Sequence, residues 1–362
     1  MSVNPKPIKK PFISIIIPCY NVAKYIFKGL ESISNQSYSS WECIVVNDGS
    51  TDNTEAEIEK WTKKDKRFQL ISQVNKGVSA ARNAGLKQAK GDCIYFFDPD
   101  DLIVQDCLEN LIELFHDNID VVIGKNAEVH GQTTEINKVF EHGITPLKEL
   151  KKTNFIELTL FHPILVVCWN NLYNAKFIFS NNLTFKEGIV HEDELWVFET
   201  LYLAKNIIFN SDVTYYYNVG NKYSITKNYS FNNLKCYITV LDEIFNNYYL
   251  KENKQNKLII GTYILKLQIT ITAGFFRFIK KNKKLTYKDE GAMLIKNHLN
   301  ACYISEYINL NPAKSNQFNI FIRYGRANPE AAFKLIRNTN KKNILKFFET
   351  SYLKYTYRNK LT

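Results

Sequence analysis

This 362-residue sequence contains seven cysteines but lacks the closely spaced cysteine pairs of a metal site or a redox motif. They are scattered and odd in number, most stand in apolar runs, and no two form a CxxC pair. Such spacing disfavours a disulfide framework and a zinc site. The seven, which we expect to be reduced and buried, are Cys19, Cys43, Cys93, Cys107, Cys168, Cys236 and Cys302.

Long apolar runs are also missing. No segment reaches the roughly 18 uninterrupted apolar residues that a membrane-spanning helix needs. The nearest, 258–279, is broken by Lys266, Gln268 and Arg277, which is typical of a helix in a packed domain. Residues 1–11 form a polar, basic arm without the apolar stretch of a signal peptide. We therefore expect a cytoplasmic protein.

Acidic residues are scarce in only one part of the chain. Residues 1–230 hold 24 Lys/Arg and 28 Asp/Glu, a net charge of −4, whereas residues 231–362 hold 23 and 8, a net charge of +15. This asymmetry predicts two domains with different functions, divided after residue 230. The length and the apolar content of 45% suffice for two folded cores.

The first third of the chain alternates short apolar runs with segments of helical periodicity. Strands are expected at 12–17, 41–46, 68–72, 93–97 and 120–124, and helices at 23–34, 52–61, 78–88 and 102–116. This alternation predicts an α/β domain with a mostly parallel sheet between helices, followed by a mainly helical C-terminal domain. Ligands of such sheets bind beyond the carboxyl ends of the strands.

Four residues with three carboxylates, Asp98-Pro99-Asp100-Asp101, directly follow an apolar strand; we call them the aspartate cluster. In an extended segment, Asp98 and Asp100 share one face while Asp101 points elsewhere. Two carboxylates this close repel each other unless a cation or hydrogen-bond donors neutralise them. Mg²⁺ or Mn²⁺ suits such oxygen ligands. The alternative is an acidic turn that caps the following helix.

Three further segments precede the aspartate cluster. They are 15–21 (IIIPCYN), 45–52 (VVNDGSTD) and 75–85 (NKGVSAARNAG). With the cluster, they resemble the nucleotide-sugar-binding segments of family 2 glycosyltransferases of the GT-A fold, in the family's order and at its spacing. The resemblance covers residues 12–105 and implies a UDP-sugar donor and a divalent metal.

The resemblance implies roles for the matching positions of the first segments. Pro18, Tyr20 and Asn21 would shape the wall of the nucleotide site, and Tyr20 offers a ring face and a hydroxyl. Asp48 would accept the imide N–H of the uracil ring, a pairing that suits a carboxylate. Lys76 would also belong to the nucleotide-sugar site.

The later matching positions would handle the diphosphate. Arg82 would lie near the pyrophosphate or pair with the aspartate cluster. Asp98 would contact the ribose or the donor sugar and join Asp100 at the Mn²⁺ or Mg²⁺, which would stabilise the charge that develops as UDP leaves. The family usually has a small residue in place of Pro99, but proline alters neither carboxylate, so the assignment stands.

A second acidic segment begins at His191 and resembles the family's catalytic segment, in which an Asp is the general base. The match selects Asp193, with Glu192 and Glu194 as competitors. Neighbouring like charges raise the pKa of such a carboxyl, which suits a base. The alternative is an acidic first turn stabilised by the dipole of the helix that follows. His191 is a ligand or a structural residue.

Two tryptophans are candidates for contacting the acceptor. Trp169 lies in a segment, 168–173, that resembles one preceding the base in relatives that build bacterial surface polysaccharides. It would stack on a sugar ring, with a buried core position as the alternative; Trp196 lies close to the base. Residues 215–217 are typical of a strand, and 224–226 resemble a loop near the diphosphate.

The basic C-terminal part contains a candidate membrane contact. Residues 343–361 place apolar and aromatic residues at helical spacing and surround them with Lys and Arg. This pattern is typical of a membrane-surface anchor, and equally of a packing helix with a solvated basic face. Nucleic acid is disfavoured as a partner because the lysines are scattered and the nucleotide-sugar site is acidic. An oligomer stays open.

Taken together, these features predict an inverting, metal-dependent hexosyltransferase. It would move a hexose or N-acetylhexosamine from a UDP-sugar to a glycan or lipid-linked acceptor hydroxyl during synthesis of a bacterial capsule, lipopolysaccharide or related surface glycan. It would work in the cytoplasm, or peripherally on the inner face of the membrane.

Two other protein classes stay open: a non-catalytic sugar-nucleotide-binding or scaffold protein of the same pathway, and a nucleotidyltransferase. The intact acidic segments count against the first. The second normally has a Gly-rich first loop, and 18–24 contains no Gly. A Rossmann dehydrogenase and a P-loop NTPase are excluded, because the chain has neither GxGxxG after the first strand nor a Walker motif.

Overall fold

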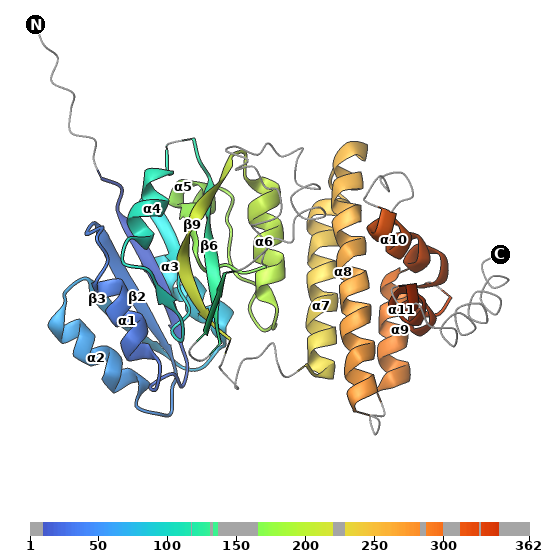
Figure 1. The fold of residues 1–362 in the computed structure, drawn as a ribbon, viewed down its shortest axis with the longest axis horizontal. Helices are drawn as coiled ribbons and strands as arrows, with labels where there is room; N and C mark the ends of the chain where they lie inside the picture. The colour runs from blue at the N-terminus through green and yellow to red at the C-terminus, as the bar shows by residue number, and fades with distance from the viewer. Residues whose placement is uncertain are drawn as a thin grey trace, which may run out of the picture. The chain divides into compact units, whose positions relative to one another are not determined.

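A computed structural model describes residues 10–116, 118–130, 133–136, 166–219, 229–282, 287–299, 312–325 and 327–339. The described residues up to Val219 form one compact unit, and those from Tyr229 form a second (Figure 1). The predicted basic helix at 343–361 and the loop at 224–226 lie outside the described residues.

The first unit is built on one nine-stranded sheet, in the order β3-β2-β1-β4-β8-β6-β9-β5, with β7 paired to β6. The strands are β1 (Ile13–Cys19), β2 (Trp41–Asp48), β3 (Phe68–Gln73), β4 (Cys93–Phe96), β5 (Leu102–Ile103), β6 (Val121–His130), β7 (Thr133–Ile136), β8 (Asn171–Asn174) and β9 (Ile207–Asn218). The helices are α1 (Ile26–Ser34), α2 (Thr54–Lys64), α3 (Val78–Gln88), α4 (Cys107–Glu113), α5 (Ala175–Ser180) and α6 (Glu192–Leu203).

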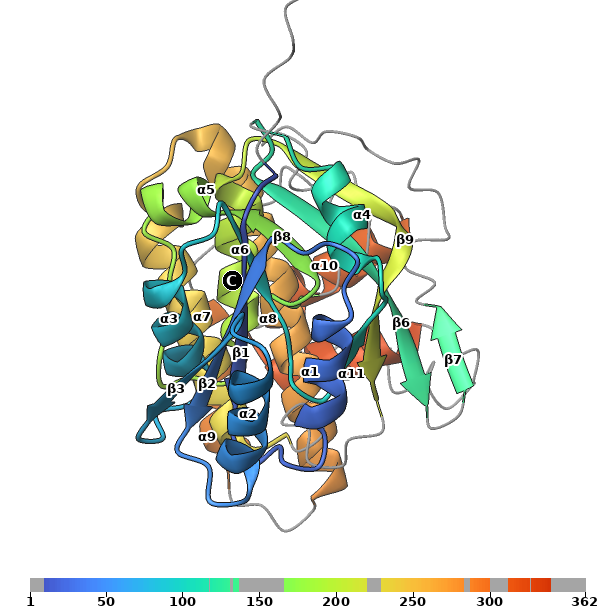
Figure 2. The same ribbon diagram turned by 90° about the vertical axis from the view of Figure 1, so that its left-hand side faces the viewer.

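The predicted parallel sheet comprises β3, β2, β1 and β4, which are all parallel. Beyond β4 the sheet is mixed, because β8 runs antiparallel to both β4 and β6 whereas β6 and β9 are parallel. The α/β class and the layered arrangement are confirmed for this unit. Figure 2 shows α1 and α2 in front of the strands β1 and β2.

Both faces of the parallel strands are buried, as their continuous apolar runs predict. Because side chains alternate along a strand, Ile13, Ile15 and Ile17 face one core together with residues of α1, α2 and α4. On the opposite face, Ile44 and Val46 of β2 pack with Ala81 and other small residues of α3. The sheet therefore lies between two layers of helices.

The prediction that a helix begins at residue 102 is wrong. Leu102 and Ile103 form the short strand β5, which pairs antiparallel with Tyr216 and Tyr215 of β9, and α4 starts only at Cys107. Strand β9 forms backbone hydrogen bonds with these residues, and local periodicity cannot predict a pairing with so distant a segment. The aspartate cluster therefore leads into a strand, and the idea that it caps a helix is ruled out.

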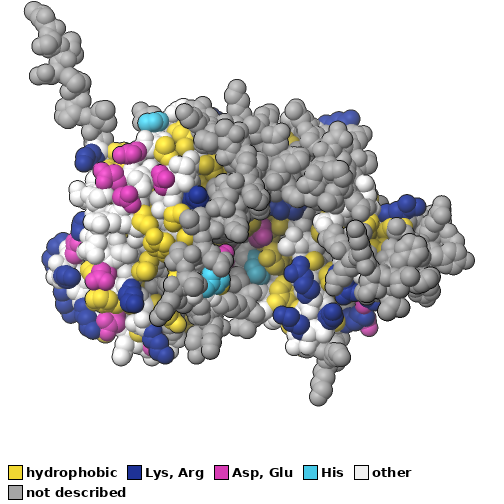
Figure 3. Space-filling view, viewed as in Figure 1, with side chains coloured by type: hydrophobic (Ala, Val, Ile, Leu, Met, Phe, Trp, Pro, Cys, Tyr) yellow, Lys and Arg dark blue, Asp and Glu magenta, His cyan; other side chains and the backbone are white. Residues whose placement is uncertain are grey.

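The second unit consists of helices. They are α7 (Phe231–Ile244), which continues as the π-helical turn η5 (Phe245–Tyr249), α8 (Lys254–Lys281), α9 (Lys288–Leu299), α10 (Pro312–Gly325) and α11 (Pro329–Thr339). The long helix α8 packs against each of the other four α-helices. The described residues of the second unit hold 14 Lys/Arg and 6 Asp/Glu, and Figure 3 shows Lys and Arg side chains on the surface of this unit.

The apolar character of α8 comes from its place in this packing. By length and composition, its segment Ile259–Lys281 can span a membrane, but 72% of its apolar window is buried inside the structure. Such burial is typical of a core helix and agrees with the prediction for 258–279. The six described cysteines are likewise buried free thiols, as expected.

Gly85 allows α3 to lie close to β1, and this contact provides a test of the fold. A methyl group at position 85 would lie 2.4 Å from Cγ2 of Ile16. We expect Gly85→Val to lower the free energy of unfolding of the first unit by about 2–3 kcal/mol through overpacking. All four tryptophans belong to this unit, so their fluorescence in urea reports its unfolding. Lys87→Val, at an exposed position of the same helix, is the control, and equal unfolding midpoints would contradict the prediction.

Candidate functional site

The segments that follow β1 and β2 are joined to each other by Asn21. Its side-chain oxygen accepts hydrogen bonds from the backbone N–H of Thr51 (2.8 Å) and of Asp52 (3.3 Å), and its own N–H donates to the Ser50 hydroxyl (3.1 Å). Asn21 has a left-handed backbone with φ of 53°, which asparagine tolerates better than most residues. Asn21, which we predicted to line the nucleotide site, therefore also joins the segments that follow β1 and β2 by hydrogen bonds.

The other two predicted wall residues differ in accessibility. Pro18 is buried inside β1, which runs through it to Cys19 rather than ending before it as predicted. Tyr20 follows with 50% of its side chain exposed. A tyrosine ring so exposed at the carboxyl end of a central strand is available for stacking on a base.

Asp48, for which the resemblance implies a hydrogen bond to uracil, is buried in this structure. Only 2% of it is accessible, and its carboxylate accepts hydrogen bonds from Gln73 Nε2 (2.7 Å) and from the backbone N–H of Lys76 (2.9 Å) and Gly77 (2.8 Å). Asp48 thus holds the segment that leads into α3. The structure shows for it a positioning role, while the side chain of Lys76 stays exposed beside it.

Arg82 of α3 is the centre of the site. Only 3% of its surface is exposed. Its Nη1 donates to Glu192 Oε1 (2.7 Å) and lies 3.5 Å from Asp193 Oδ1, and its Nη2 donates to Asp98 Oδ1 (3.1 Å). One guanidinium therefore connects α3, the end of β4 and the start of α6, and pairs with acids from both acidic segments.

Asp193 has the electrostatics of a general base. Burial raises the pKa of Asp193 to about 7; Arg82 opposes this rise, while the charges of Glu192 and Asp98 add to it. About a quarter of its side chain remains accessible. A carboxyl that titrates near neutrality and is open to a reactant suits proton abstraction. Glu192 is more deeply buried and hydrogen-bonded to Arg82, which makes it the weaker candidate.

His191 acts through its backbone at the start of α6. It occupies the N-cap position in a left-handed conformation with φ of 68°. Burial lowers the pKa of its imidazole to about 4, so the ring is neutral at physiological pH.

Among the described residues, no group of three or more His, Cys, Asp and Glu side chains is placed to hold a metal ion.

Burial alternates along the aspartate cluster as predicted, although its residues form a turn and not the extended segment that we expected. Asp98 and Asp100 are partly exposed, whereas Pro99 and Asp101 are buried. The two exposed carboxylates supply hard oxygen ligands of the kind Mg²⁺ or Mn²⁺ takes, but too few to surround an ion. The residues therefore fit a metal that takes its remaining ligands from phosphate oxygens and water, as Mg²⁺ usually does.

Both tryptophans predicted to contact the acceptor belong to the core instead. Trp169 is 4% exposed and stacks on Tyr215 (ring centroids 4.4 Å apart) and Tyr217 (5.3 Å). Trp196 is 1% exposed and stacks on Phe185 (4.2 Å). Aromatic faces already covered by other rings offer no platform to a sugar, so these two predictions are wrong in this structure.

Asn83 is a site residue that the sequence did not single out. Its side chain accepts from the backbone N–H of Phe185 (2.8 Å) and donates to the Phe185 carbonyl (2.9 Å) and to Glu187 (3.1 Å). With Arg82, it attaches the chain leading into α6 to α3. Its position directly after Arg82 was the available signal.

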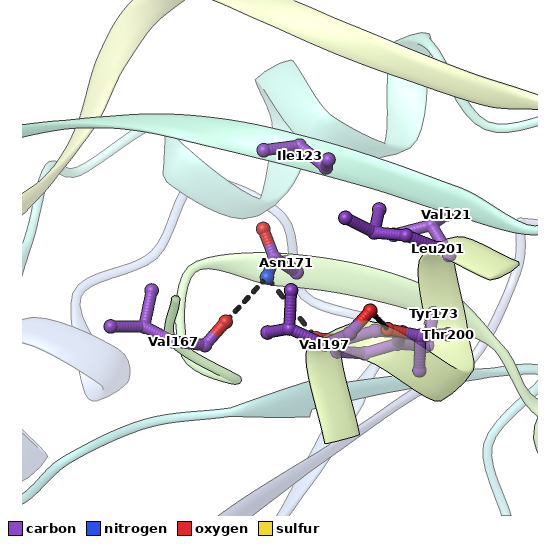
Figure 4. A pocket seen from close by; sticks show the side chains of 8 residues that line it. All are labelled: Val121, Ile123, Val167, Asn171, Tyr173, Val197, Thr200 and Leu201. Carbon is purple, nitrogen blue, oxygen red and sulfur yellow. Dashed lines mark hydrogen bonds between the residues drawn. The ribbon is translucent and has the colours of Figure 1, made fainter. Parts of the chain in front are cut away.

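A small cavity elsewhere in this unit is not the donor site. Its volume is about 20 Å³, close to what one water molecule needs. Val121, Val197 and Leu201 are among its lining residues, and inside it Asn171 donates to the Val167 carbonyl and to Tyr173 (Figure 4). It is lined by residues of α6, β6 and β8 and lies away from the carboxyl ends of β1, β2 and β4.

Comparison with known sequences gives consistent matches. Residues 14–176 match the family described as glycosyl transferase family 2. The putative glycosyltransferase EpsH of Bacillus subtilis is 30% identical over 59% of this chain and 62% of its own length. TarP of Staphylococcus aureus, a poly(ribitol-phosphate) beta-N-acetylglucosaminyltransferase, is 28% identical over 70% of this chain and 79% of its own length. The chain spans less than two thirds of EpsH.

A solved structure shares the fold. Residues 1–349 of S. aureus TarS, in complex with UDP-GlcNAc, align with a TM-score of 0.64 and 20% identity over 96% of this chain and 92% of the TarS chain. A complex of the same TarS fragment with UDP gives the same TM-score. The likeness confirms the predicted fold class, GT-A with a helical C-terminal region.

The raised pKa of Asp193 predicts a pH-dependent effect on stability. Its pKa in the folded protein lies above its usual value near 3.8, so folding favours the protonated carboxyl. This contribution to stability is complete below pH 4 and is lost as the pH rises through 7. Because Asn cannot ionise, we expect Asp193→Asn to melt above wild type by a few degrees at pH 8 and by clearly less at pH 5.

Thermal unfolding followed by tryptophan fluorescence at the two pH values measures this difference. Asp212→Asn, which removes an exposed carboxylate of β9, is the matched control and should shift neither melting temperature. A gap between Asp193→Asn and wild type that is the same at both pH values would rule out the ionisation of Asp193 as its cause.

Proposed function

We propose that this chain is a glycosyl transferase of family 2, whose model residues 14–176 match, and that it is a metal-dependent, inverting enzyme that uses a UDP-sugar. The observation that carries the proposal is the single buried Arg82, which brings Asp193 and Asp98 to 3.5 and 3.1 Å from its guanidinium. A base and a donor-binding carboxylate are thereby held beside one another, at the strand ends where ligands of such sheets bind.

Asp193 acts on the acceptor in the proposed reaction. It takes the proton of the acceptor hydroxyl while that oxygen attacks the anomeric carbon, and the sugar–phosphate bond breaks as UDP leaves. Attack from the face opposite the leaving group inverts the anomeric configuration. A pKa near 7 leaves about half of the Asp193 carboxyls ionised at neutral pH, and an ionised carboxyl with this pKa is basic enough to accept a proton in the transition state.

Asp98 and Asp100 serve the donor side. A divalent cation bound there would offset the negative charge of the diphosphate and of the departing UDP. Arg82 keeps its own charge next to Asp98 and thereby limits the repulsion among the carboxylates around it. Tyr20 stacks on the base, and Asn21 together with Asp48 holds the surrounding segments in place.

The names of the relatives support a more specific donor and acceptor. TarS was solved with UDP-GlcNAc, and TarP is named for transferring N-acetylglucosamine to a poly(ribitol-phosphate). We take an N-acetylhexosamine as the preferred sugar and a cell-surface polymer or its lipid-linked precursor as the acceptor. The net charge of +15 over residues 231–362 suits an anionic acceptor or membrane surface on the cytoplasmic side.

Binding of the nucleotide should require the metal and the aspartate cluster. We expect UDP with Mn²⁺ to raise the melting temperature by several degrees, because a ligand that binds only the folded state stabilises it. GDP with Mn²⁺, or UDP with EDTA, should give little shift. Asp100→Asn should lose the Mn²⁺-dependent part, whereas Asp106→Asn, an exposed acid of the next segment, should retain it. An identical shift with EDTA present would contradict the metal requirement.

Turnover tests the assignment of the base. In an assay of UDP release with UDP-GlcNAc and an acceptor, Asp193→Asn should lower kcat about a thousandfold, while the Asp212→Asn control keeps the wild-type rate. Glu192→Gln should remain active, and its rate should rise with pH at a lower midpoint than wild type, because the Glu192 charge raises the Asp193 pKa. An active Asp193→Asn or a dead Glu192→Gln would reverse the assignment. No UDP release with any donor would favour a scaffold protein.

A further inference from the structure

The aspartate cluster is anchored to β9, a strand more than a hundred residues further along the chain. Within the cluster, the backbone N–H of Asp101 donates to the Asp98 carbonyl (3.1 Å) and closes a turn. The Asp101 carboxylate then accepts from the Tyr215 hydroxyl (2.7 Å) and from the backbone N–H of Asn218 (2.7 Å). Asn218 also donates from its side chain to the Asp100 carbonyl (3.4 Å). Strand β9 thus binds both ends of the turn.

The hydroxyl of Tyr215 makes two of the contacts that define this turn. It donates to Asp101 and accepts from the backbone N–H of Asp98 (3.3 Å). One oxygen therefore lies between the first and last residues of the cluster. Because the Tyr215 hydroxyl contacts Asp98 and Asp101, the two ends of the turn, a shift of this hydroxyl would move the partly exposed carboxylates of Asp98 and Asp100.

The ring of Tyr215 is itself immobilised. Tyr215 has no accessible surface. Its ring stacks on Trp169 at 4.4 Å with an interplanar angle of 14° and meets Phe97 edge-on at 5.8 Å. Trp169 is in turn covered by Tyr217 and bridged to Phe96 of β4. A side chain packed this tightly places its hydroxyl with little freedom, which is what holding a ligand geometry requires.

We propose that Tyr215 is a positioning residue, which through its hydroxyl orients Asp98 and Asp100 toward the metal and the diphosphate. The inference rests on the proposed function for the identity of the ligand. Asp101 is the link and not a ligand, because it is 2% exposed and each of its carboxylate oxygens already accepts a hydrogen bond. The stack of Trp169 on Tyr215 restricts the ring that carries this hydroxyl.

Tyr215→Phe tests the proposal, because it keeps the stacked ring and removes only the hydroxyl. Tyr217→Phe is the matched control: it makes the same change in the neighbouring ring that covers Trp169. Mn²⁺ titrated into each protein with UDP, and followed by the EPR signal of free Mn²⁺, gives the dissociation constant. We expect it to rise about tenfold in Tyr215→Phe and to be unchanged in Tyr217→Phe.

Hydrogen exchange without metal or nucleotide supplies a second measurement. The backbone N–H of Asp98 donates to the Tyr215 hydroxyl, so a peptide covering 98–101 should exchange about tenfold faster in Tyr215→Phe. Peptides from β1 and α3 should exchange as in wild type. UDP release should show kcat reduced in parallel with the loss of Mn²⁺ affinity, and an unchanged KM for the acceptor.

The outcomes separate this proposal from the function on which it rests. Wild-type Mn²⁺ affinity and wild-type exchange in Tyr215→Phe, even with a lowered melting temperature, would reduce Tyr215 to a packing residue and overturn the proposal. If wild type itself binds no Mn²⁺ with UDP, the proposed function fails. In that case faster exchange at 98–101 would still establish that Tyr215 holds the turn.

Discussion

The site depends on the pairing of one buried cation, Arg82, with carboxylates from two distant parts of the chain. Asp98 comes from the end of β4, and Glu192 and Asp193 from the first turn of α6. Without the guanidinium, three acids would lie together in a poorly solvated place and repel each other. Breaking such a buried pair typically costs about 3–5 kcal/mol. The constraint therefore joins the stability of the first unit to the geometry of its chemistry.

Burial gives this arrangement its chemical character. It raises the pKa of Asp193 to about 7 against the opposing effect of Arg82, and an exposed aspartate would titrate several units lower. Ionised Asp193 therefore lowers the stability of the folded protein, because its charge lies buried beside other acids. Other polar residues hold the surrounding segments in place: Asn21 and Asp48 bind the segments that follow β2 and β3, and Asn83 binds the chain that leads into α6.

Much of the fold was predictable because its signals are local. The strands that became β1, β2, β3 and β4, and the helix α3, are marked by apolar runs and by periodicity, and their boundaries differed by only a few residues. Leu102 was misassigned to a helix because its partner, Tyr216, is distant in sequence. The tryptophans Trp169 and Trp196 were misassigned for a related reason: a sequence does not say which rings cover a ring.

The sequence by itself determined which residues are candidates for the chemistry: the acids of the aspartate cluster, Arg82 and the acidic start of α6 stand in the order and at the spacing of the family that the sequence resembles. Only the tertiary structure decided how these residues are arranged. It placed Arg82 between the acids, turned Asp48 inward as a support, and tied Asp101 to Tyr215. The physical reason is that burial and hydrogen bonding between distant segments set charge and orientation, and neither is written in the local pattern of residues.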